Sequence, residues 1–147
     1  MYNVTMCFKK KTKQIIQPDF KDTITGQKIA ILLKSKFPNA IIAQEDEKYK
    51  LCTRENIEDF LKIDITDKLE YIDNYRDCED YSFILIAEIK KSAFSPIPFG
   101  LIWVDTGISS HSVNIFIDNE RNLYVIEPQN DSIFNFPDKW TPKLVMI

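Results

Sequence analysis

The stretch "YRDCEDYSFILIAEI", residues 75–89, decides the architecture expected of this chain. Its apolar residues recur at helical spacing. Asp77 suits the N-cap, because an Asp side chain at that position can accept a bond from a free backbone N–H of the first turn. A cysteine and two acidic residues follow, and the helix dipole favours carboxylates there. The pattern predicts a helix from Cys78 to about Lys91, with a cysteine at its N-terminus.

The remaining elements predict a domain with helices on one side of a sheet. Two more helices are expected over 23–37 and 53–63, the second with Thr53 as its N-cap. The stretch 66–76 is ambiguous between a short helix and an extended segment. Turn signals separate the later strands, which favours an antiparallel meander and an α+β fold class. The expected strands cover 2–8, 40–44, 49–52, 99–105, 112–118, 122–128 and 140–147.

Composition limits the classes of protein that this chain can belong to. Its 147 residues are 44% hydrophobic, which predicts one domain over 1–147. A net charge of −3 argues against a nucleic-acid partner. The chain has no apolar run of membrane-spanning length and no signal-peptide pattern. Three widely spaced cysteines make no disulfide framework, so we expect a reduced, cytoplasmic protein. The sequence does not indicate an oligomeric state.

The single histidine, His111, belongs to a predicted hairpin that turns over 118–121. Side chains alternate along a strand, so residues two apart share a face. A shift of two residues in register would keep the histidine and a glutamate on the same face, whereas a shift of one would separate them. The expected facing pairs are Ile115–Leu123, Val113–Val125 and His111–Glu127.

Taken singly, Cys78, His111 and Glu127 each favour a structural role. Taken together, they favour a catalytic site. An imidazole oriented by a carboxylate can act as a general base. A cysteine in the first turn of a helix is helped to ionise by the free N–H groups and the dipole. Glu79 and Asp80 oppose this ionisation, because nearby negative charge disfavours a thiolate. A protonated His111 close to Cys78 would reverse that balance.

The segments "DCEDYSF", "HSVNIFID" and "YVIEPQ" together resemble the papain-like and transglutaminase-like cysteine-enzyme superfamily. Within it, they are most similar to the C-terminal cysteine-protease domain of Marasmius oreades agglutinin. The resemblance covers residues 71–129 well and the first seventy residues only in general layout. It implies Cys78 as nucleophile, His111 as base and Glu127 as the orienting carboxylate. It also implies Gln129 as a supporting group on the same strand face.

The chain departs from that superfamily in one respect. Papain-like enzymes carry a glutamine shortly before the cysteine to help form the oxyanion hole, and residues 45–77 contain no glutamine. The backbone N–H of Cys78 could supply one donor. Tyr71, Asn74 or Tyr75 would have to supply the other.

A calcium ion is the one cofactor that the resemblance raises, because calcium dependence is known in the agglutinin-like branch. The carboxylates that could hold it are scattered along the chain, and no compact run of oxygen ligands appears. We therefore expect no cofactor and no metal. The scattered residues are Glu79, Asp80, Asp105 and Asp118.

These observations predict a papain-like cysteine hydrolase, a peptidase or amidase, with a peptide or protein substrate and a Cys78–His111–Glu127 triad. Acyl transfer of the transglutaminase kind would use the same residues. The alternative from another functional class is a binding or interaction module that has kept these three residues. The missing glutamine favours this module, and the co-facing histidine and glutamate favour the enzyme. Cys78 is expected to react fast as a thiol, and Cys7 and Cys52 slowly.

Overall fold

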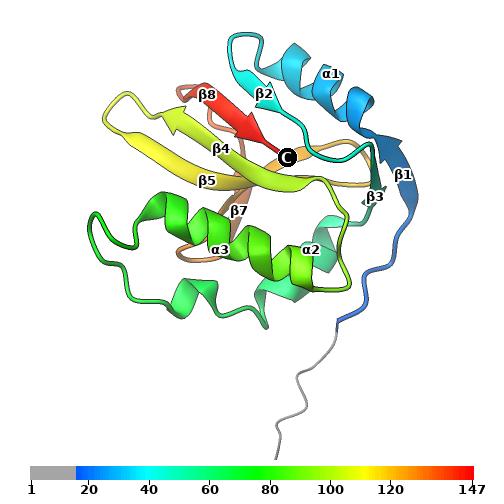
Figure 1. Cartoon of the computed structure of the whole chain (residues 1–147), viewed down its shortest axis with the longest axis horizontal. Helices are drawn as coiled ribbons and strands as arrows, with labels where there is room; N and C mark the ends of the chain where they lie inside the picture. The colour runs from blue at the N-terminus through cyan, green and yellow to red at the C-terminus, as the bar shows by residue number, and fades with distance from the viewer. Residues whose placement is uncertain (1–15) are drawn as a thin grey trace, which may run out of the picture.

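A six-stranded sheet with helices on both faces organises the chain in the computed structural model, which describes residues 16–147 (Figure 1). The predicted strand 2–8 and the prediction for Cys7 lie outside the described residues. No helix within 16–147 combines the length and the apolar character that crossing a membrane requires. The elements are β1 (Asp22–Thr25), α1 (Gly26–Lys36), β2 (Ile41–Ala43), β3 (Lys48–Leu51), α2 (Arg54–Leu61), the short 3-10 helix η1 (Thr66–Lys68), α3 (Cys78–Lys91), β4 (Phe99–Asp105), β5 (Ser110–Ile117), β6 (Leu123–Glu127), β7 (Ser132–Asn135) and β8 (Thr141–Met146).

The strand order of the large sheet is β2-β8-β4-β5-β6-β7, and β1 pairs with β3 in a separate small sheet. β2 runs parallel to β8, whereas all other neighbouring strands are antiparallel. The sequence missed β7. The predicted α+β class, with helices packed on an antiparallel sheet, is therefore corrected. Residues 16–147 form eight strands and only three α-helices, and their main sheet is mixed.

Helix boundaries follow the capping residues. The Thr53 side chain accepts a bond from the backbone N–H of Asn56 at 3.3 Å, so α2 begins where the sequence predicted. α3 spans Cys78–Lys91 with Asp77 at its N-cap, as predicted. The helix predicted over 23–37 starts later than expected. Its first residues form β1, because Thr25 is the residue whose side chain caps α1.

Each face of the large sheet carries its own hydrophobic core. Alternate residues of β5 divide between the two, with Val113 and Ile115 on one face and Phe116 on the other. The first core packs beneath α1, with Ile29 and Leu33 among its buried residues. The second packs beneath α2 and α3. Its residues include Ile57, Phe60, Leu61, Leu85 and Ile89.

The β5–β6 hairpin has a longer turn than the sequence predicted. Ile115 faces Val125 and Ile117 faces Leu123, so the predicted register is wrong by two residues. The cause is Asp118, whose Oδ1 accepts bonds from two backbone N–H groups of the turn at 2.8 Å each. This bonding closes a turn over 118–122. The shift is even, so His111 and Glu127 still share a face.

Three buried oxygens without a hydrogen-bond partner lie in η1 and in the β6–β7 turn within residues 16–147: Thr66 Oγ1, Asp67 Oδ1 and Asp131 Oδ1. Asp131 has a positive φ of 60°, which Asp and Asn tolerate better than most residues. Burial, together with the negative charges of Asp67 and Asp64, raises the pKa of Asp131 to about 6, against a lowering by Lys68. The ionised form of this carboxyl therefore opposes folding.

Asp131→Asn should stabilise the protein at pH 7 and leave its stability unchanged near pH 4. The folded pKa of Asp131 lies above its ordinary value of 3.8, so the folded state binds the extra proton between these values. Stability is consequently lost as pH rises through that window. Asparagine keeps the backbone preference and removes the charge. We expect a melting temperature about 3 °C higher at pH 7. Asp138→Asn, at an exposed position, is the control. An equal gain at pH 4 and pH 7 would contradict the assignment.

Candidate functional site

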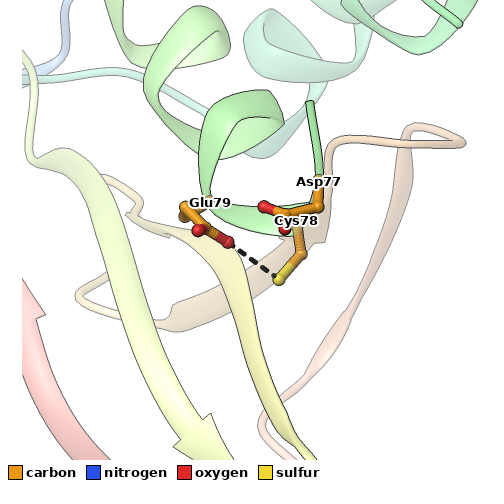
Figure 2. Close-up of side chains that lie close together, drawn as sticks. All are labelled: Asp77, Cys78 and Glu79. Carbon is orange, nitrogen blue, oxygen red and sulfur yellow. Dashed lines mark hydrogen bonds between the residues drawn. The ribbon is translucent and has the colours of Figure 1, made fainter. Parts of the chain in front are cut away.

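Cys78 is the first residue of α3, and its thiol lies between that helix and β5. The Sγ donates to Oε2 of Glu79 at 3.4 Å (Figure 2). Burial raises the pKa of the Cys78 thiol, the hydrogen bond to Glu79 raises it further, and a hydrogen bond from the backbone N–H of Ser112 lowers it. The thiol is therefore protonated at rest, and a base is needed to activate it.

The carboxyls of Asp77 and Glu79 form a pair beside the thiol (Figure 2). The interaction between the two carboxyls raises the pKa of Asp77, which burial raises further, and lowers the pKa of Glu79. The backbone N–H of Asp77 donates to Oδ2 of Asp80 at 3.2 Å, which ties the start of α3 to its own first turn.

A buried polar contact holds the start of α3 against β5. The Ser112 hydroxyl donates to Ser82 Oγ at 3.1 Å, and the Ser82 hydroxyl donates to the carbonyl of Cys78 at 3.0 Å. The Asn114 amide donates to the carbonyls of Ser82 and Gly100, each at 3.0 Å. Asn114 therefore has a structural role here. Sequence reasoning missed the two serines, although polar residues inside apolar stretches were the available signal.

His111 and Glu127 meet at the end of the β5–β6 hairpin. Nε2 of His111 lies 2.8 Å from Oε2 of Glu127, and the two side chains are only 23% and 17% exposed. Because Glu127 engages Nε2, Nδ1 is the ring nitrogen left for another partner. The Trp140 ring stands perpendicular to the imidazole, 6.1 Å away between centroids. The sequence did not connect Trp140 with this pair.

The Cys78 thiol lies beside the start of β5, the strand that carries His111. Ser112, whose backbone N–H lowers the pKa of the Cys78 thiol, directly follows His111 in the chain. Among the hydrogen bonds of residues 16–147 there is no direct bond between Cys78 and His111, since the thiol donates to Glu79. In Figure 1, α3 begins and the β4–β5 hairpin turns at the same side of the fold, at the left, and Cys78 and His111 lie near the starts of α3 and β5.

The two residues predicted to support the triad, Tyr71 and Gln129, lie in different parts of the fold. Tyr71 is half exposed, and its ring stacks on that of Tyr81 with 6.3 Å between the centroids. Burial raises the pKa of Tyr71, and the charges of Asp77 and Asp73 raise it further. Gln129 lies in the β6–β7 turn rather than on a strand, which corrects its predicted position. Its backbone N–H donates to Oε1 of Glu127 at 3.4 Å.

The acidic residues considered for calcium do not converge. Asp118 closes the β5–β6 turn, and Asp105 accepts from the N–H of Gly107 at 2.8 Å. Within residues 16–147, one group has metal-ligand spacing, and it consists of Asp77, Cys78 and Glu79. Calcium favours six to eight oxygen ligands, and a thiol is not one of them. This donor set does not fit calcium.

No protein-family model matches the chain, and no curated protein matches it. The fold is similar to that of PSL1a in a solved complex with E64, with a TM-score of 0.75, 16% identity, and coverage of 85% of this chain and 50% of that chain. It is also similar to Polyporus squamosus lectin bound to the human-type influenza-binding epitope Neu5Aca2-6Galb1-4GlcNAc, with a TM-score of 0.71 and 17% identity. That match covers 85% of this chain and 49% of the lectin chain.

The chain thus spans about half the length of the solved chains it matches, and at this identity the likeness shows the fold alone. The solved structures with this fold are described as those of a lectin. On this comparison the predicted membership of the papain-like and transglutaminase-like superfamily is wrong, as is the papain-like fold label. The predicted cysteine hydrolase acting on peptides is corrected with them, because both structures are described by what they bind.

Replacing one buried serine should destabilise the fold more than replacing two. Ser82→Ala leaves the Ser112 hydroxyl buried without its partner, which costs about 1–3 kcal/mol of unfolding free energy. Ser82→Ala combined with Ser112→Ala removes both partners and should recover part of that loss. Urea unfolding of the single and double variants measures both. Ser35→Ala is the control, since its hydroxyl bonds a backbone carbonyl on an exposed helix surface. Additive losses would show that the two hydroxyls do not support each other.

Proposed function

We propose that this chain is a ligand-binding module whose site is centred on the Cys78 thiol, with His111 and Glu127 as its acid–base partners. The observation that carries the proposal is the position of the thiol. It lies close enough to the backbone N–H of Ser112 for that group to lower its pKa, and Ser112 follows His111, which pairs with Glu127. The fold's likeness to two ligand complexes supports a binding function.

The chemistry suited to this site is capture of an electrophile. PSL1a, the first of the two similar structures, is a complex with E64, and E64 is an epoxide, a class that alkylates thiols. His111 would take the thiol proton while Glu127 holds the ring in place. The sulfur would form a bond to an epoxide carbon, the carbon–oxygen bond would break, and the resulting alkoxide would take the proton back from the imidazolium.

Cys78 should react with E64 at pH 7, whereas Cys52 should not. Cys52 is fully buried, and burial raises the pKa of its thiol to about 12. His111→Ala should slow labelling of Cys78 about a hundredfold at pH 7, because the raised pKa of Cys78 leaves little thiolate without a base. Raising the pH should narrow that gap as thiolate forms unaided. Peptide-resolved mass spectrometry over a time course gives the rates.

Two matched variants separate chemistry from stability in this experiment. Glu127→Gln keeps the shape of the side chain and should slow labelling through loss of imidazole orientation, with little change in melting temperature. Cys52→Ala should leave the labelling rate of Cys78 unchanged. Equal labelling of Cys78 and Cys52, or a rate at Cys78 that ignores His111, would contradict the proposed site.

Carbohydrate binding is the second candidate function, and the glycan complex of Polyporus squamosus lectin favours it. A cavity of about 320 Å³ supports this candidate. Aromatic walls with a few polar groups are common in ligand pockets. An ammonium group in the lining could pair with the carboxylate of a sialic acid. The relevant lining residues are Lys36, Asn39, Phe136, Asp138 and Trp140.

The trisaccharide Neu5Aca2-6Galb1-4GlcNAc should bind this cavity saturably if the candidate holds. Lys36→Gln should weaken binding roughly fivefold through loss of an exposed ion pair, as measured by calorimetric titration. Lys28→Gln, on the same helix but outside the cavity lining, is the matched control. Binding that is absent, or that is equal in both variants, would remove the carbohydrate candidate and leave the thiol site.

Two further properties belong to the proposal. We propose that the chain acts as one domain, supported by two hydrophobic cores that share a single sheet. We also propose that it works in a reducing compartment such as the cytoplasm, because the site requires a free thiol. Cys78 and Cys52 are both free within the described residues.

A further inference from the structure

The segment around the Cys78 thiol carries a higher density of negative charge than the rest of the chain. Residues 70–80 hold five carboxylates and one guanidinium, a formal charge of −4 in a chain whose total is −3. The guanidinium of Arg76 donates to the backbone carbonyl of Glu70. Within 16–147, no Lys or Arg forms an ion pair with any of the five. They are Glu70, Asp73, Asp77, Glu79 and Asp80.

These carboxylates act both on the Cys78 thiol and on Tyr71. Glu79 and Asp77 both raise the pKa of Cys78, in addition to burial. Asp77 and Asp73 do the same to Tyr71. Two groups on different segments therefore experience one negative field. In Figure 2 the side chains of Asp77 and Glu79 lie close to the sulfur of Cys78.

Apolar and aromatic side chains stand exposed in the same segment. Tyr71 is 50% exposed and Tyr75 is 85% exposed, with Ile72 between them at 41%. Tyr71 is held in place by stacking on the buried Tyr81, whose hydroxyl donates to the carbonyl of Leu69 at 2.5 Å. A fixed aromatic face beside carboxylates attracts organic cations, because the ring quadrupole and the charges act in the same direction.

We infer that the Cys78 site takes a cationic ligand, an ammonium or guanidinium compound with an apolar body, whose charge lies among the carboxylates of 70–80 and whose body contacts Tyr71. This inference rests on the proposed thiol site and names its ligand class. It also accounts for an arrangement that otherwise hinders the thiol, since carboxylates beside a cysteine oppose its ionisation. A cation arriving with the ligand cancels that opposition when the electrophile is in place.

Paired methanethiosulfonate reagents test this charge preference directly. One carries a trimethylammonium group and the other a sulfonate, and both form a disulfide with a thiol while methanesulfinate leaves. We expect the cationic reagent to be favoured at Cys78. At low salt, the rate of the cationic reagent divided by that of the anionic one should be roughly ten times larger at Cys78 than with 2-mercaptoethanol. The excess should disappear near 1 M salt, where charges are screened over about 3 Å. Peptide mapping assigns the label to Cys78.

Charge-neutralising variants locate the effect. Asp73→Asn combined with Glu70→Gln removes two charges without touching the thiol and should lower the excess about threefold. Glu55→Gln, the same chemical change on α2, is the control and should leave it unchanged. Fast labelling of Cys78 with no charge preference would overturn this inference while the thiol site stands. Labelling of Cys78 no faster than that of Cys52 by either reagent would overturn both.

Discussion

The hydrogen bond between the buried hydroxyls of Ser82 and Ser112 fixes the relation between α3 and β5, on which the candidate site depends. Helices and sheets held together by apolar packing alone can slide, because dispersion contacts are not directional. Two buried hydroxyls and the Asn114 amide instead specify one register. The thiol of Cys78 thereby meets the backbone of the strand that carries His111. Without that register, a helix-start cysteine and a hairpin histidine would have no defined geometry.

Local patterns predicted much of the fold. The cap residues Thr53 and Asp77 set the starts of α2 and α3, and β4 begins and ends where its sequence indicates. The sharing of one face by His111 and Glu127 followed from period-two alternation, which survives an even error in register. That error came from the side chain of Asp118, whose bonds to the turn backbone lengthen the hairpin.

Long-range features escaped prediction. The parallel pairing of β2 with β8 joins segments a hundred residues apart, and neither segment signals its partner. β7 is short and half exposed, so its pattern is weak. The superfamily resemblance rested on the order and spacing of three residues, Cys78, His111 and Glu127. Such spacing constrains which residues can meet, whereas fold and activity require comparison of whole structures. In that comparison the similar structures are those of a lectin.

The insertion of β8 between β2 and β4 has a consequence for how the chain folds. β8 comes last in the described chain and occupies an interior position, so the edges of β2 and β4 stay open until it docks. Contacts of such high sequence separation form slowly, because the entropy of closing a long loop is lost before the pairing forms. Gly100 of β4 restricts the register in which β8 can pair, since a Cβ at this position would lie 1.9 Å from the Met146 carbonyl oxygen. Until β8 docks, β2 and β4 therefore each leave one strand edge unpaired, and exposed edges of this kind favour aggregation during folding.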